Sequence, residues 1–356
     1  MRNLRFLASQ FSPLSPIRIS FGFRPALRED FGLRARVACA FLSLLVGSGC
    51  VHYRLASPPR QPQALPEAIL AECAYSRSNA PAVLEWEPQT NAPYRLAKVK
   101  LPSPVLAASS NKILDLEYYL PRNPSKARLP VVMILPVSAG AHYPLERHFA
   151  RYFSRRGMAA VIVHRESGPD PKTAEEINGL LRQSVADNSR VVDWLQTRPE
   201  LDAARLGVLG TSMGAIKGSL FVAVDPRVKA AVLGLVGGDL PYILAYSKEG
   251  AWRGGGIVRR REAYLAEHHL TREQFRTELA AGIRYDPKLL APYVDPKKVL
   301  LILGACDTIV PFKKGRELRR EMGNPQTGVV LAGHYTALLY LPYIRAAAFN
   351  FFQRHF

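Results

Sequence analysis

The chain has 356 residues, of which 48% are hydrophobic, enough to enclose a large core as one domain or as one domain with an insertion. The formal net charge is +19, but residues 1–36 hold seven Arg against two acidic residues and carry five of those charges. The remaining basic residues form no aromatic-interleaved stripe and no known nucleic-acid motif, so a nucleic-acid partner is not expected. The four cysteines show no CxxC or metal spacing, so neither a metal site nor a disulfide framework is expected.

Residues 1–50 are typical of an export segment. Arg34 and Arg36 precede ten mostly apolar residues, 37–46, which rise only about 15 Å as a helix, half the thickness of a bilayer. The sequence Gly-Ser-Gly-Cys at 47–50 resembles a bacterial lipoprotein box, with glycine where the first position is usually leucine. The same glycines suit an ordinary signal peptidase. We therefore predict either a periplasm-facing envelope lipoprotein, anchored in the membrane through Cys50, or a secreted protein.

Residues 51–93 are rich in Pro, Ala and Gln. This composition predicts a tether, with at most a short helix over 66–75.

From residue 94 to residue 356 the pattern alternates between strands and helices. Apolar and polar residues alternate within 111–122, which predicts a half-buried strand. Continuous apolar runs, typical of strands buried on both faces, lie at Val131–Leu135, Ala159–Val163, Leu206–Leu209, Ala230–Val236 and Val299–Leu303. Helical patterns lie between them at Leu145–Arg156, Ala174–Thr197 and Met213–Val224. This alternation predicts an α/β protein, a mainly parallel sheet flanked by helices.

Residues 239–295 interrupt the alternation, because they contain no strand candidate. Thr271 and Gln274 form a capping-box pattern that opens a helix through Ala281. We predict an inserted helical cap that lies over the sheet as a lid.

Ser212 stands between Gly210 and Gly214, where the apolar run of 206–209 gives way to a helical pattern. This is the G-x-S-x-G pattern of a nucleophile elbow, a tight turn that exposes the serine hydroxyl and turns the N–H of Met213 toward the same space. A packing turn made of small residues is the alternative, and the pentapeptide alone does not exclude it.

A serine hydroxyl needs a base and an acid that orients the base. Asp307 follows one buried strand and His334 follows the last one, so the chain order is Ser, Asp, His. Asp239, after the preceding strand, is the alternative acid. His164 also ends a strand, but it precedes the serine.

Four segments in order, PELDAARLGVLGTSMGA, DPRVKAAVLG, GACDTIVP and GHY, resemble α/β-hydrolases, closest to the dienelactone-hydrolase-like and acyl-esterase-like members. The resemblance implies the α/β-hydrolase fold and a serine hydrolase with the triad Ser212, Asp307 and His334. It also implies a small-molecule ester substrate and no metal or organic cofactor.

The oxyanion hole departs from that family. Members often carry His-Gly after the third strand, whereas this chain has MILPVSAG. We expect the N–H of Val137 to act with that of Met213, because Pro136 has none; Ser138 would serve if the loop is shifted.

Two other functions stay open at this point. A prolyl-oligopeptidase-like peptidase is disfavoured because no propeller-like pattern precedes the hydrolase region. A catalytically silent envelope protein that uses the fold to bind a ligand is the other.

Overall fold

The computed structural model describes residues 52–75, 82–87, 92–104, 113–123, 128–138, 142–164, 173–248 and 256–356. The predicted export segment, with Cys50, lies outside the described residues. Residues 52–356 form one compact unit. Within the described ranges, no helix is long and apolar enough to cross a membrane.

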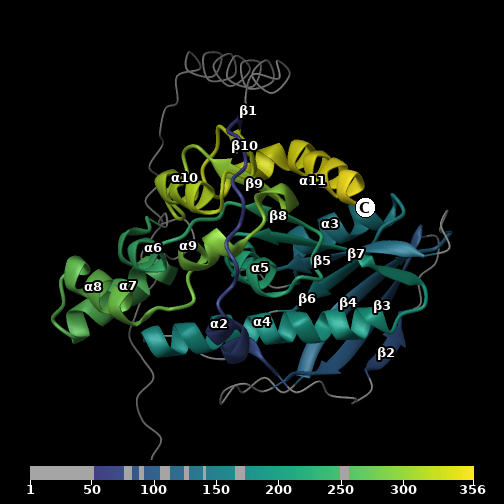
Figure 1. Cartoon of the computed structure of the whole chain (residues 1–356), viewed down its shortest axis with the longest axis horizontal. Helices are drawn as coiled ribbons and strands as arrows, with labels where there is room; N and C mark the ends of the chain where they lie inside the picture. Colours follow the sequence, from purple (N-terminus) through teal and green to yellow (C-terminus); the bar gives the residue numbers. More distant parts are fainter. Residues whose placement is uncertain are drawn as a thin grey trace, which may run out of the picture. The chain divides into compact units, whose positions relative to one another are not determined.

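A ten-stranded sheet forms the centre of this unit (Figure 1). In spatial order its strands are β1 (His52–Leu55), β10 (Gln326–Val330), β9 (Val299–Gly304), β8 (Ala230–Gly234), β7 (Leu201–Thr211), β5 (Leu129–Leu135), β6 (Ala159–Val163), β4 (Ile113–Pro121), β3 (Tyr94–Pro102) and β2 (Val83–Trp86). The six strands from β10 to β6 are parallel, and the others pair antiparallel. The predicted α/β fold class is confirmed.

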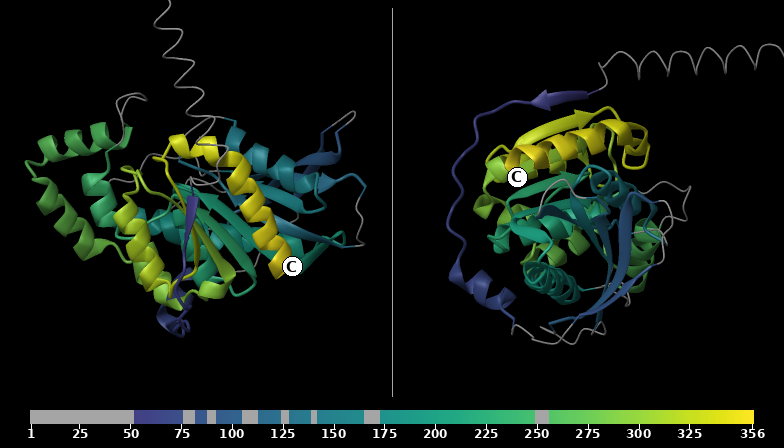
Figure 2. Two further views of the ribbon diagram at one scale, coloured as in Figure 1. Left: turned by 90° about the horizontal axis from the view of Figure 1, so that it is seen from above. Right: turned by 90° about the vertical axis from the view of Figure 1, so that its right-hand side faces the viewer.

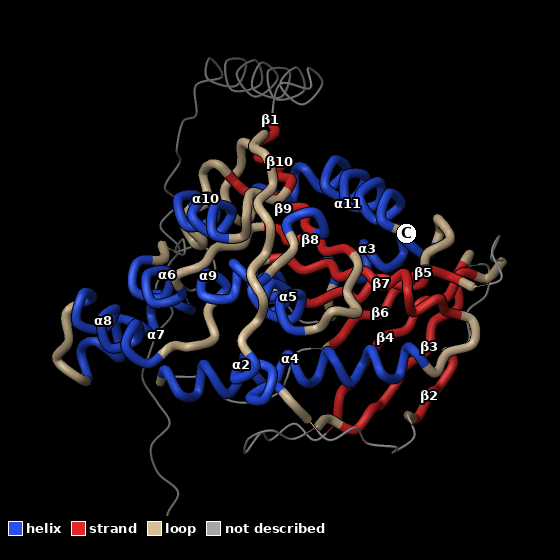
Figure 3. Tube along the Cα trace, viewed as in Figure 1, coloured by secondary structure: helices blue, strands red, loops and turns tan. Residues whose placement is uncertain are grey.

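Each central strand contributes side chains to two cores, one on either face. In β5, Val131 and Met133 belong to one apolar cluster, and Val132 and Ile134 belong to the other, as the two-residue period of a strand requires. The helices α4 (Ala174–Gln196) and α5 (Met213–Val224) cover the first face. On the second face lie α3 (Pro144–Ser154) and α11 (Leu341–His355), and Figure 3 shows helices on both sides of the sheet.

The predicted tether over 51–93 is wrong at β1 and β2, which are strands of the sheet, whereas the short helix predicted over 66–75 is confirmed. The strand β1 pairs antiparallel with β10, and the N–H of Arg60 donates to the carbonyl of Gly323. The chain then runs down the outside of the domain to α2 (Glu67–Cys73) (Figure 2), where Glu72 accepts a hydrogen bond from the Tyr285 hydroxyl. The physical reason is that β10 would otherwise leave its edge unpaired.

The insertion after β8 is helical, but it has two parts. The first comprises α6 (Leu240–Tyr246), α7 (Gly256–Glu267) and α8 (Arg272–Gly282), and α7 and α8 project from one end of the domain (Figure 1). The predicted capping box is present at Thr271 and Gln274.

The second part, residues 283–295, belongs to the core instead of a lid. Ile283, Leu290 and Val294 are buried in the larger cluster, and α9 (Pro287–Leu290) packs against α5. The predicted lid therefore does not include residues 283–295, and a lid formed by the rest of the insertion stays a prediction. Asn178 of α4 fixes the boundary, because its side chain donates to the carbonyl of Gly282 and accepts from the N–H of Arg284.

Candidate active site

Ser212 occupies a strained turn between β7 and α5. Its backbone has φ +55° and ψ −120°, a conformation that costs a residue with a side chain about 1–3 kcal/mol. The Ser212 N–H donates to the carbonyl of Gly234 at 2.8 Å, and its own carbonyl accepts from the N–H groups of Ala215 and Ile216. The neighbouring strand and the helix together hold the turn.

The two flanking glycines are required by close backbone contacts. A Cβ atom on Gly210 would lie 2.3 Å from the carbonyl oxygen of Gly214. On Gly214, a Cβ atom would lie 2.0 Å from the carbonyl oxygen of Leu135. Side chains at either position would push the helix away from the sheet, so the pattern reflects packing as well as chemistry.

Three polar side chains from three strand ends form a chain of hydrogen bonds. His334 follows β10, and its Nε2 lies 2.9 Å from the Oγ of Ser212. The Nδ1 of the same ring lies 2.7 Å from Oδ2 of Asp307, which follows β9. With a proton on Nδ1, the ring donates to Asp307 and Nε2 accepts from the serine hydroxyl. This is the arrangement in which imidazole removes the hydroxyl proton.

Asp307 is held on both of its oxygens. While Oδ2 faces His334, Oδ1 accepts from the N–H groups of Ile309 and Val310 at 2.9 and 3.0 Å. Its side chain is 2% exposed. The carboxylate therefore cannot rotate away from the imidazole without losing both backbone bonds.

Asp239, the alternative acid, lies in a different set of contacts. Its Oδ1 caps α6 by accepting from the N–H of Tyr242, and its Oδ2 lies 2.7 Å from Nζ of Lys314. Burial lowers the pKa of Lys314, but the contacts with Asp239 and Glu317 outweigh it, and the net pKa is raised. The Asp239 carboxylate is thus paired with an ammonium group and does not contact His334.

The expected second oxyanion donor requires a correction. The N–H of Val137 donates to Oε1 of Glu146 at 2.9 Å, so it is already engaged. Glu146 is a buried residue of α3. Sequence could not anticipate this bond, because a loop residue and a helix residue meet only through the fold. The next N–H, that of Ser138, has no hydrogen-bond partner within the described part of the chain.

The N–H of Met213 fits the expectation better. Met213 is the first residue of α5, and the first amides of a helix have no partner within it.

A second polar cluster, absent from the sequence prediction, lies on β4 and β6. Glu117 of β4 is buried and accepts from Nη2 of Arg147 at 2.6 Å, from the Nε N–H of Arg147, which is shared between both carboxylate oxygens, and from the Tyr119 hydroxyl. Nε2 of His164, just after β6, lies 3.2 Å from the same carboxylate. Burial opposes the charged carboxylate, but the bonds from His164, Arg147 and Tyr119 outweigh it and lower the pKa of Glu117 to about 2.

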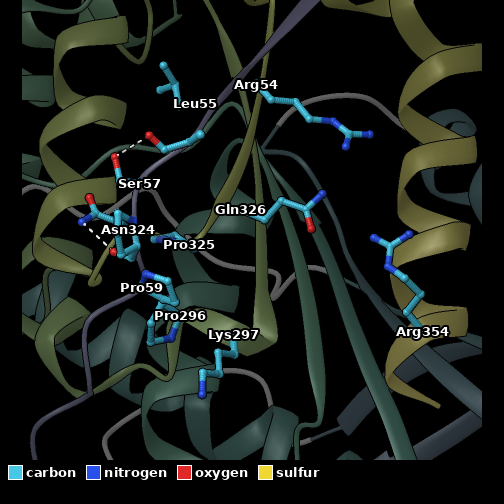
Figure 4. Close-up of a pocket in the computed structure, with 12 residues that line it drawn as sticks. Arg54, Leu55, Ser57, Pro59, Pro296, Lys297, Asn324, Pro325, Gln326 and Arg354 are labelled. Carbon is cyan, nitrogen blue, oxygen red and sulfur yellow. Dashed lines mark hydrogen bonds between the residues drawn. The ribbon is translucent and has the colours of Figure 1, made fainter.

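A cavity of about 870 Å³ lies away from this site. It is lined by Arg54, Lys297, Gln326 and Arg354 among others (Figure 4). Gln326 begins β10, whereas His334 follows its end, so the cavity opens at the opposite edge of the sheet. Among the described residues, no group of three His, Cys, Asp or Glu side chains is placed to hold a metal ion.

Solved structures show what this architecture is. The acetyl xylan esterase from Paenibacillus sp. R4 matches with a TM-score of 0.60 and 17% identity, over 82% of this chain and 92% of that one. Acetyl xylan esterase 1 from Thermoanaerobacterium sp. JW/SL YS485 matches with a TM-score of 0.56 and 15% identity, over 78% and 92%. The Pyrococcus furiosus esterase Pf2001 matches with a TM-score of 0.51 and 16% identity, over 84% and 99%. The chain therefore has the α/β-hydrolase fold.

Sequence similarity to curated proteins is shorter. The thiohydrolase apmlB of Arthrinium phaeospermum is 26% identical over 117 residues, which are 30% of this chain and 35% of that protein. The uncharacterized protein PA2218 of Pseudomonas aeruginosa is 29% identical over 125 residues, 33% of this chain and 32% of that one. Each match spans about a third of the relative's length, and no family model matches the chain.

Proposed function

We propose that the protein is a serine hydrolase that cleaves carboxylic esters through an acyl-Ser212 intermediate. The observation that carries the proposal is the chain of hydrogen bonds from the Ser212 Oγ through His334 to Asp307, at a strained turn. The turn presents the hydroxyl at the C-terminal ends of parallel strands, where ligands of such sheets bind. Esterases among the solved structures of this fold support the choice of an ester substrate.

The chemistry follows from the two ring nitrogens. Nε2 of His334 takes the hydroxyl proton while Oγ attacks the ester carbonyl, and Asp307 stabilises the imidazolium that forms. The tetrahedral intermediate collapses when Nε2 returns the proton to the departing alcohol. Water, deprotonated by the same nitrogen, then attacks the acyl-serine, and Nε2 returns that proton to Oγ of Ser212 as the bond to the acyl group breaks and the acid leaves.

For the oxyanion we propose the N–H of Met213 with that of Ser138. Neither N–H has a hydrogen-bond partner among the described residues, whereas the Val137 N–H is bound to Glu146. The bond to Glu146 holds the loop after β5 and so positions the next amide.

The test is a panel of p-nitrophenyl esters and thioesters, of increasing acyl length, with the wild-type chain and its Ser212→Ala variant. Thioesters are included because one relative is named a thiohydrolase. We expect ester turnover that Ser212→Ala abolishes, together with labelling of the wild type by a fluorophosphonate. Cleavage of proline peptides in place of esters would move the assignment to a peptidase. An unlabelled wild type would support a binding protein.

We also propose that the protein is exported and that Cys50 carries the lipid. The basis is the Gly-Ser-Gly-Cys sequence after an apolar stretch of ten residues. In a bacterial host, Cys50→Ser should move the processed protein from the membrane fraction to the soluble fraction, whereas Cys73→Ser should not. An unchanged membrane fraction would indicate an ordinary signal-peptidase site.

A further inference from the structure

The loop that carries His334 exposes large apolar side chains to solvent. They are Leu331 at 64%, Tyr335 at 39%, Leu338 at 52% and Leu339 at 65% exposure, and we call these four residues the apolar rim. The rim flanks His334 on both sides in the chain. Exposed apolar groups gathered in one place typically mark an interaction site.

Hydrogen bonds fix the conformation of the loop over residues 331–340, so these apolar side chains are exposed by a defined structure. The N–H of Gly333 donates to Oγ1 of Thr336 at 2.8 Å, and the N–H of Ala337 donates to the carbonyl of Gly333. The Tyr340 hydroxyl donates to the carbonyl of Leu331. Ala337 is buried in the core, which turns its neighbours Leu338 and Leu339 outward.

The chain also enters the folded unit at this edge. In the antiparallel register of β1 and β10, His52 lies opposite Val330, the residue before the rim. The His52 ring packs against the ring of Tyr343, with 4.0 Å between centroids and a tilt of 33° between the planes. From there β1 leads away from the active-site edge, toward the cavity in Figure 4. The folded unit therefore begins, at His52, beside the rim.

From these observations we propose that the apolar rim binds the surface of a phospholipid membrane and turns the mouth of the Ser212 site toward the lipid. The proposal rests on the proposed function and adds that the ester substrate comes from the membrane phase. A bilayer fits better than a second copy of the chain, because residues 51–356 alone carry 41 Lys and Arg against 27 Asp and Glu, a net charge of +14, and the copies repel. The same positive charge attracts the domain to a bilayer that contains anionic lipids.

The position of the chain entry strengthens the choice of a membrane. His52 follows Cys50 by two residues, a span of at most about 7 Å when extended. A lipid on Cys50 would therefore tether the folded unit through the strand end that lies beside the rim.

The test compares vesicle binding of full-length proteins in a Cys50→Ser background, so that a lipid on this cysteine contributes nothing. Leu338→Ser with Leu339→Ser should lower co-sedimentation with phosphatidylglycerol–phosphatidylcholine vesicles at least about tenfold. Turnover of a soluble short ester should change less than about twofold, since neither residue contacts the Ser212–His334–Asp307 chain. Leu70→Ser, at an exposed leucine of α2, is the matched control and should bind like the parent.

Three results would overturn the proposal. The first is unchanged vesicle binding by the rim variant. The second is loss of binding on Arg354→Glu, at the cavity on the opposite edge, with no loss in the rim variant, because that would reverse the orientation. The third is a dimer in sedimentation velocity that the rim variant dissociates. Vesicle binding is measured without substrate, so a chain with no ester activity would refute the proposed function and leave this test intact.

Discussion

Two carboxylate–histidine pairs lie in the same sheet, and they differ in what else touches each member. In the first pair, Asp307 contacts His334 and, among the described residues, otherwise accepts only backbone N–H groups, and the second ring nitrogen faces Ser212. In the second pair, Glu117 lies 3.2 Å from His164, but Arg147 binds both of its oxygens. The His164 ring stacks on Tyr143 at 4.4 Å.

The difference teaches which pair is able to act as a base. The charge of Glu117 is already neutralised by a guanidinium group, so little of it remains to stabilise an imidazolium. The charge of Asp307 has no cationic partner within the described part of the chain, and it is directed at one ring nitrogen. Within the same residues, no serine hydroxyl is hydrogen-bonded to His164. Residue type alone does not separate the two histidines, whereas their partners do.

The largest effect is expected at the first pair. Ser212→Ala and His334→Ala should each lower ester turnover on the order of 10⁴-fold or more, because only binding and the oxyanion donors remain. His164→Ala should lower ester turnover less than about tenfold, since the carboxylate of Glu117, the partner of His164, is already paired with Arg147. Initial rates on p-nitrophenyl acetate measure both, with circular dichroism as the folding control. Equal losses of turnover for the His164 and His334 variants would contradict the assignment of His334 as the base.

The next largest loss of activity is expected on substitution of Asp307, the acid that orients His334. Asp307→Asn should cost on the order of 10⁴-fold in kcat, because an amide cannot hold the tautomer that donates from Nδ1. Asp239→Asn removes the charge beside Lys314 but keeps an oxygen that can cap α6, and it should cost far less activity. The reverse ranking would make Asp239 the acid and place His334 in a different conformation during turnover.

Parts of the fold and of the site could be predicted from the sequence. The sheet core could be predicted, since runs such as Val299–Leu303 are apolar throughout, and β9 spans Val299–Gly304. Chain order was enough to bring Ser212, Asp307 and His334 together as candidates. β3 is absent from the prediction, although Ala97, Val99 and Leu101 alternate with polar residues and are buried.

Other features of the fold and the site leave no pattern in the local sequence from which they could be predicted. β1 is four residues long and exists because β10 offers an open edge far along the chain. Neither the bond from Val137 to Glu146 nor the Glu117 cluster follows from spacing, because each joins elements that meet only in the folded protein. Pairings set by tertiary packing are the part that a single sequence does not display.

A smaller effect is expected at the support of the oxyanion loop. Glu146→Ala frees the Val137 N–H and lets the loop after β5 move, and it should lower kcat by about 10- to 100-fold, below the loss of a whole donor. KM should change little, because the amide acts on the transition state. Glu146→Gln keeps an accepting oxygen and should restore most of kcat. If Glu146→Gln is as impaired as Glu146→Ala, the carboxylate charge matters and the positioning role is wrong.

The smallest effect on activity, and a clear one on stability, belongs to the second pair. Glu117→Gln removes the charge that Arg147 and Tyr119 bind, and should lower the free energy of unfolding at pH 7 by about 2 kcal/mol, with turnover nearly unchanged. The pKa of Glu117 is lowered from 4.5 to about 2 in the folded chain, so its contribution is complete above about pH 4.5 and is lost as the pH falls toward 2. The difference in unfolding free energy between wild type and Glu117→Gln, from urea titrations, should therefore shrink across that window. Glu273→Gln, at an exposed pair with Arg276, is the matched control and should show no such dependence. A difference that stays constant down to pH 2.5 would mean that Glu117 stabilises the fold through packing and that its charge is not what Arg147 holds.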